Sequence, residues 1–142
     1  MNALYIETSA LLSWLLGEPN SKEVIKAINA AEQIVTSSLT IVETFRALIR
    51  ADAEKLITPK EHQKLKGLYQ QQALSWFFLE MNESVLKKSS QPFPVEPIRS
   101  LDAIHLASIL ELCQIFPDMK ILSFDKRILA NLPLLGLIEA AL

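Results

Sequence analysis

The chain has 142 residues, of which 50% are hydrophobic and 21% charged, and this balance excludes a disordered or low-complexity chain. The length predicts one domain, residues 1–142, with a substantial core. Fourteen basic and sixteen acidic residues give a net charge of −2, which argues against a simple basic module for binding nucleic acid. One cysteine, Cys113, excludes an internal disulfide. With neither a long apolar run nor a basic leader, we expect a cytoplasmic protein that makes no membrane contact.

Local patterns predict alternating strands and helices. Apolar runs indicate strands, helical spacing of apolar residues indicates helices, and capping residues mark where helices begin. In chain order the predicted elements are a strand at 3–6, a helix capped by Thr8 or Ser9 that runs to about 16, a helix from 21, a strand at 34–37, a helix at 39–52, a helix from 58, a strand at 75–79, a helix from the cap Asn82 to about 88, a helix from 100, a strand at 120–124, a short helix from 125 and an edge strand within 137–142. Such alternation predicts an α/β fold with a mostly parallel sheet and helices on both faces.

Four acidic residues fall where predicted strands end or helices begin. Glu7 follows the first strand, Asp125 follows the fourth, and Glu43 and Asp102 lie in the first turns of two apolar helices. In open parallel sheets, ligands bind beyond the carboxyl ends of the strands. Carboxylates gathered there would repel one another, and Mg²⁺ or Mn²⁺, which prefer oxygen ligands, would remove that repulsion.

Each acid also has a purely structural interpretation. Glu43 can complete a capping box with Thr40, Asp102 can stabilise the start of its helix, and Asp125 can be an N-cap. Glu7 is harder to explain in this way, because it interrupts an apolar stretch in which an ionised carboxylate is costly.

Four stretches carry a family resemblance. They are Tyr5-Ile6-Glu7-Thr8-Ser9-Ala10-Leu11, Ser38-Leu39-Thr40-Ile41-Val42-Glu43, Leu101-Asp102-Ala103-Ile104-His105-Leu106-Ala107 and Leu122-Ser123-Phe124-Asp125-Lys126-Arg127. In order and spacing the chain resembles the PIN-domain family, and within it the VapC-type toxins of bacterial toxin–antitoxin pairs. The resemblance implies a three-layer α/β/α sandwich and a hydrolase, an endoribonuclease that depends on Mg²⁺ or Mn²⁺. It also implies a homodimer and a cognate antitoxin as protein partner.

Roles pass to this chain only at matching positions. Glu7, Glu43, Asp102 and Asp125 would form the catalytic, metal-binding pocket. Ser9 and Ser123 match hydroxyl positions beside it that would support metal-bound water or the phosphate. The family pattern has Asp where this chain has Glu7, and the additional methylene displaces the carboxylate by about one C–C bond, ~1.5 Å.

Basic residues near the acids are candidates for contact with RNA phosphate. Arg99 precedes the Asp102 helix and Lys126 follows Asp125, so both are assigned to substrate binding. His105, three residues after Asp102, is interpreted as a packed, hydrogen-bonded side chain rather than a metal ligand. Two alternatives to the ribonuclease stay open: a catalytically impaired PIN-fold binding or regulatory module, suggested by Glu7, and hydrolysis of DNA or another phosphoester.

Overall fold

The computed structural model describes residues 1–142 and contains one five-stranded sheet. Its strands are β1 (Ala3–Ile6), β2 (Gln33–Ser37), β3 (Phe77–Leu79), β4 (Lys120–Leu122) and β5 (Ile138–Glu139). Their order across the sheet is β3-β2-β1-β4-β5, and every neighbouring pair is parallel. The first strand of the chain therefore lies at the centre, where all four of its residues are buried.

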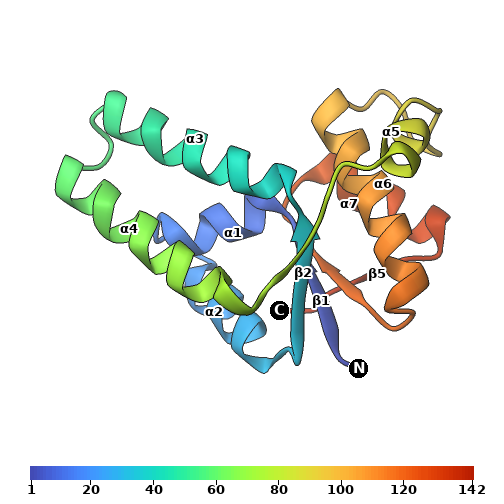
Figure 1. Ribbon diagram of the computed structural model, residues 1–142, viewed down its shortest axis with the longest axis horizontal. Coiled ribbons are helices and arrows are strands. Elements are labelled where there is room, and N and C mark those ends of the chain that lie inside the picture. Colours follow the sequence, from blue (N-terminus) through green and yellow to red (C-terminus); the bar gives the residue numbers. More distant parts are fainter.

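Seven α-helices cover the two faces of the sheet. They are α1 (Thr8–Leu15), α2 (Ser21–Ala30), α3 (Leu39–Ala53), α4 (Pro59–Gln72), α5 (Glu83–Ser89), α6 (Ser100–Ile115) and α7 (Lys126–Asn131). Helices α1 to α4 lie on one side of the sheet and α5 to α7 on the other (Figure 1). The predicted α/β/α sandwich with a parallel central sheet is confirmed.

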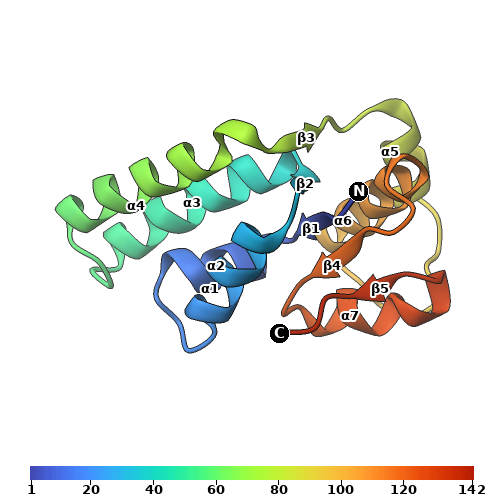
Figure 2. The ribbon, with the colours of Figure 1, turned by 90° about the horizontal axis from the view of Figure 1, so that it is seen from below.

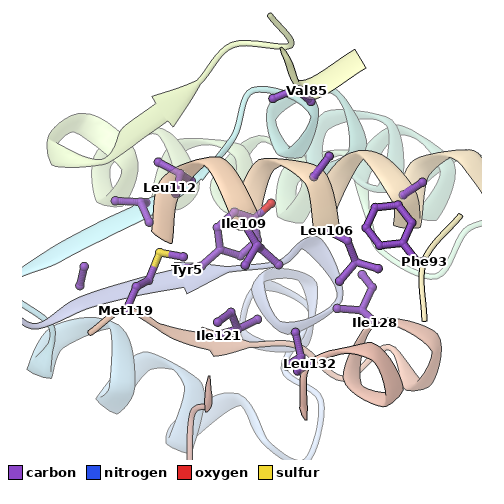
Figure 3. Close-up of a cluster of buried hydrophobic side chains, with 14 residues drawn as sticks. Tyr5, Val85, Phe93, Leu106, Ile109, Leu112, Met119, Ile121, Ile128 and Leu132 are labelled. Atoms are coloured by element: carbon purple, nitrogen blue, oxygen red, sulfur yellow. The ribbon is translucent and has the colours of Figure 1, made fainter. Parts of the chain in front are cut away.

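Two apolar cores hold these layers together. Because successive residues of a strand point to opposite faces, β1 contributes to both cores: Tyr5 packs with α6, whereas Ile6 packs with α1. Figure 3 shows Leu106 and Ile109 of α6 lying over Tyr5 and Ile121 of the sheet.

Helix α6 buries eight of its sixteen residues, more residues than any other helix, as its nearly uniform apolar sequence predicts. Its burial nevertheless reflects packing within the protein. None of the seven helices combines the length and the apolar composition that crossing a membrane requires.

Local signals placed most helix starts correctly. At α4 the Thr58 hydroxyl accepts from the Glu61 amide and the Glu61 carboxylate accepts from the Thr58 amide, both at 3.0 Å, which is the predicted capping box. Asn82 and Asp125 cap α5 and α7 as predicted.

Several strand boundaries differ from the prediction. Residues 73–75 form a 3₁₀ turn, and the third strand begins only at Phe77. The fourth strand ends at Leu122, and the edge strand has two residues. The apolar patterns were longer than the strands because Trp76 and Phe124 pack beside the sheet without pairing in it.

The crossover connections bring the functional segments together. In a parallel sheet a helix that directly follows a strand begins at the edge where the strands end, and so does a helix that runs back to the start of the next strand, as α6 runs back to β4. The first residues of α1, α3, α6 and α7 therefore meet at one edge; Figure 2, seen along another direction, shows α1 and α3 on one side of the sheet and α6 and α7 on the other.

We predict that Leu106→Ala lowers the free energy of unfolding by about 2–5 kcal/mol, because the side chain is fully buried between α6 and the sheet. Leu74→Ala is the matched control, since Leu74 is 78% exposed and should change stability by less than about 0.5 kcal/mol. Urea unfolding of both variants tests this; equal losses would contradict the assignment of the core.

Candidate functional site

One pocket at the carboxyl edge of the sheet collects all four predicted acids. Its volume is about 390 Å³, and its lining residues are Glu7, Glu43, Arg99, Ser100, Leu101, Asp102, His105 and Asp125. The acids come from four separate segments: the β1–α1 junction, α3, α6 and the cap of α7. The predicted convergence of the four carboxylates is therefore observed in the structure.

Glu7 is the N-cap of α1, a role that the sequence had assigned to Thr8 or Ser9. One carboxylate oxygen, Oε2, accepts from the Ser9 amide at 3.0 Å. The other, Oε1, accepts from the Ser9 hydroxyl and, at 2.5 Å, from the Ser123 hydroxyl. The longer glutamate side chain is thus folded back onto two serines, which explains how a 5% exposed carboxylate is accommodated.

The two serines also tie the strand ends together. The Ser9 hydroxyl accepts from the Phe124 amide at 2.9 Å, and the Ser123 hydroxyl accepts from the Asp125 amide at 3.0 Å. Each serine therefore donates to Glu7 while it orients the backbone that leads to Asp125. Their predicted position beside the acidic pocket is observed.

Glu43 reaches out of α3 toward α6. Its Oε1 atom accepts from the Thr8 hydroxyl at 2.6 Å and lies 2.7 Å from His105 Nε2. Burial opposes ionisation of Glu43, but the hydrogen bonds from His105 and Thr8, and the positive charge that His105 can carry, outweigh it and lower its pKa. Glu43 is therefore held as a carboxylate.

The alternative interpretation of Glu43 as part of a capping box with Thr40 is wrong. Helix α3 begins at Leu39, so Thr40 lies within the helix rather than at its cap. Its hydroxyl pairs with that of Thr36 at 2.8 Å.

Asp102 and Asp125 face a shared guanidinium. Arg99 Nε lies 3.5 Å from Asp102 Oδ2, and an Arg99 terminal nitrogen lies 3.9 Å from Asp125 Oδ2. Asp102 also accepts from the Arg99 amide at 3.3 Å, while Asp125 caps α7 by accepting from the Arg127 and Ile128 amides at 2.9 and 3.1 Å. Asp102 thus lies in the first turn of α6 and Asp125 caps α7, and both also line the pocket.

The other predicted residues separate into two groups. Arg99 lines the pocket, whereas Lys126 is exposed at the start of α7 and does not line it. The sequence analysis missed Thr8 and Tyr5 as neighbours of the acids. The signal for Thr8 was its position directly after Glu7, but nothing local to Tyr5 indicated its contact with His105, 100 residues away.

The donor set is chemically suited to a divalent cation, since it offers four carboxylates and no thiolate. As the side chains stand, however, no group of three His, Cys, Asp or Glu residues is arranged to hold a metal ion. Each carboxylate instead accepts hydrogen bonds from the protein itself.

A second hollow adjoins the acidic pocket. It measures about 610 Å³ and shares Glu43 with that pocket. Its other lining residues come from α1, from α3 and from the C-cap of α3, and they are Thr8, Leu12, Arg46, Ala47, Ile49, Arg50, Ala53 and Glu54. Arg46 is exposed and makes no ion pair, whereas Arg50 pairs with Glu54 at 2.9 Å.

Comparison with known proteins agrees with this architecture. The family model described as "PIN domain" matches residues 4–133. The chain belongs to the PIN-domain family. This PIN domain is 28% identical to Ribonuclease VapC35 from two strains of Mycobacterium tuberculosis, over 127 residues that cover 88% of the chain and 86% of each relative. A solved toxin–antitoxin complex from Klebsiella pneumoniae contains a chain of the same fold, with a TM-score of 0.60, 17% identity and 92% coverage of both chains.

For this PIN domain we predict that Ser123→Ala lowers the free energy of unfolding by about 1–3 kcal/mol, because the buried Glu7 oxygen and the Asp125 amide both lose a partner. Ser75→Ala is the matched control. Ser75 is exposed in the 3₁₀ turn that precedes β3, and its hydroxyl makes no hydrogen bond. The measurement compares the denaturant midpoints of unfolding of the two variants with that of the wild type. If both variants match the wild type, Ser123 does not support the buried carboxylate.

Proposed function

We propose that this protein is a Mg²⁺- or Mn²⁺-dependent endoribonuclease that hydrolyses phosphodiester bonds in RNA, as the toxin of a toxin–antitoxin pair. The observation that carries the proposal is the pocket into which Glu7, Glu43, Asp102 and Asp125 converge from four segments. Membership of the PIN-domain family and similarity to a protein named Ribonuclease VapC35 support it.

In this proposal the four acids hold the cation directly or through water. Four carboxylates in one pocket repel each other, and oxygen ligands are those that Mg²⁺ and Mn²⁺ prefer, so the donor set fits. When bound, a divalent ion supplies Lewis-acid stabilisation of the phosphate and lowers the pKa of a water molecule. One of the carboxylates then accepts the proton of the attacking water as general base.

Basic side chains around the acids would bind the RNA backbone. Arg99 is 69% exposed in its side chain and lies at the mouth of the acidic pocket, where a phosphate oxygen can accept from it. Lys126 is exposed next to Asp125. The second hollow extends from Glu43 past Arg46. The Arg46 guanidinium is therefore a further cation that the RNA backbone beside the scissile phosphate can contact.

The proposed partners are a cognate antitoxin and a second copy of the chain, acting in the cytoplasm. Support comes from the relative named as a VapC ribonuclease and from the fold shared with a chain of a toxin–antitoxin complex. Val42 and Ile49 are exposed on α3 and Leu101 on α6, and these apolar side chains are available for such contacts.

We predict that Asp102→Asn and Asp125→Asn each lower the rate of RNA cleavage on the order of 100-fold or more, because each removes a charge from the pocket. Asparagine keeps the cap of α7, so loss of activity need not reflect unfolding. The assay uses an RNA panel with Mg²⁺ or Mn²⁺, with EDTA as the metal-free condition and single-stranded DNA in parallel.

Asp118→Asn is the control for charge removal, since Asp118 is exposed before β4, at the opposite edge of the sheet. Wild-type rates in both pocket variants would overturn the proposed roles. Cleavage of DNA in preference to RNA would favour a deoxyribonuclease instead.

One observation favours a second candidate, a PIN fold with impaired catalysis that serves as a binding or regulatory module. Both oxygens of Glu7 already accept hydrogen bonds from the protein, which leaves fewer lone pairs of this carboxylate for a cation.

Glu7→Asp separates the two candidates. For an active nuclease we predict that this variant cleaves RNA about 10-fold more slowly than the wild type, because the shorter side chain loses its contact with Ser123. A wild type without activity that gains cleavage through Glu7→Asp would instead establish the impaired module.

A further inference from the structure

His105 is a buried polar side chain on an otherwise apolar part of α6. It is 1% exposed and lies one helical turn after Asp102. Both of its ring nitrogens have partners: Nδ1 lies 2.7 Å from the Tyr5 hydroxyl, and Nε2 lies 2.7 Å from Glu43 Oε1. The three residues therefore form a continuous hydrogen-bonded row from the central strand, through α6, to an acid of the pocket.

The direction of the bond to Glu43 follows from its chemistry. An ionised carboxylate only accepts hydrogen bonds, so Nε2 carries the proton whether the imidazole is neutral or charged. At the other end of the row, burial raises the pKa of Tyr5 well above its ordinary value, and the charges of Glu7 and Glu43 raise it further. Tyr5 therefore keeps its hydroxyl proton and meets Nδ1 as a neutral group.

The row also determines which oxygen of Glu43 is available. The Thr8 hydroxyl, at 2.6 Å, and His105 Nε2 both bind Oε1. With Oε1 held by two donors, Oε2 is the oxygen left for a ligand of the pocket. Tyr5 in turn holds the imidazole through its hydroxyl and through an edge-on ring contact at 6.1 Å between centroids.

We propose that His105 is a positioning residue that presents Glu43 Oε2 to the cation, and that Tyr5 holds the imidazole ring in the orientation this requires. The inference rests on the proposed function, in which Glu43 belongs to the metal pocket. Hydrogen-bond partners of metal-binding carboxylates typically change metal affinity or activity by about 10–100-fold when removed.

Two substitutions of similar polarity separate positioning from packing. Glutamine can place its amide nitrogen near the position of Nε2 and still donate to Glu43, whereas the shorter asparagine can place a polar atom only near Nδ1, on the Tyr5 side. The experiment titrates Mn²⁺ alone into wild-type, His105→Gln and His105→Asn protein by calorimetry, and then measures kcat and KM for RNA. We expect His105→Gln to stay within about 3-fold of the wild-type Mn²⁺ affinity and His105→Asn to lose about 10–100-fold, with the loss of activity in kcat.

Tyr5→Phe gives a second measurement that does not replace the buried imidazole, and we expect a smaller loss of Mn²⁺ affinity, about 3–10-fold. His62→Asn is the control, because His62 makes the same type of contact, 2.7 Å to Asp52, between α3 and α4 and away from the acidic pocket. This control should bind Mn²⁺ like the wild type.

Wild-type Mn²⁺ affinity in both His105→Asn and Tyr5→Phe would overturn the positioning role and leave the proposed function intact. Equal losses in His105→Asn and His105→Gln would also overturn it, since packing alone would then explain the effect. A wild type that neither binds Mn²⁺ nor cleaves RNA would contradict the proposed function, and the positioning role with it.

Discussion

The arrangement of this protein depends on keeping four negative charges at one edge of a sheet. Like charges at short range destabilise a folded chain unless each is compensated. Here every carboxylate has its own donors, and for Glu7 and Glu43 a donor comes from a distant segment: Ser123 after β4 donates to Glu7 after β1, and His105 of α6 donates to Glu43 of α3. The first contact joins the ends of two neighbouring strands, and the second joins helices from opposite faces of the sheet. Arg99 adds a cation that faces the remaining two acids.

Three of these acids both stabilise a helix start and line the pocket. Asp125 caps α7 through two backbone amides and also lines the pocket, and Glu7, which lines the pocket too, caps α1 through the Ser9 amide. A helix N-terminus favours a nearby carboxylate, so acids placed at such positions are stabilised before any ligand arrives. For Glu7, Asp102 and Asp125, a structural role at a helix start and a place in the pocket therefore do not exclude each other, because the topology brings these helix starts to the edge where ligands bind.

Much of this was predictable from local sequence, and the remainder depended on distant contacts. Alternating apolar runs and capping residues predicted the sandwich, and acids at element junctions predicted which side chains meet. What Glu7 does there was not predictable, since its second partner, Ser123, lies 116 residues away. The contacts of His105 likewise reach residues that are 62 and 100 positions away. Strand ends were misplaced because an apolar side chain such as Trp76 packs equally well beside a sheet as within it.

The strand order has a consequence for biosynthesis. The central strand is the first strand of this sheet to be synthesised, but one of its two neighbours, β4, begins only at Lys120, and the last pocket acid is Asp125. Pairing across so long a stretch of chain is slow and comes late in folding. A nascent or prematurely terminated polypeptide that lacks this region has neither a complete sheet nor a complete acidic pocket. The sheet and the acidic pocket can therefore be completed only after the segment from Lys120 to Asp125 has been synthesised.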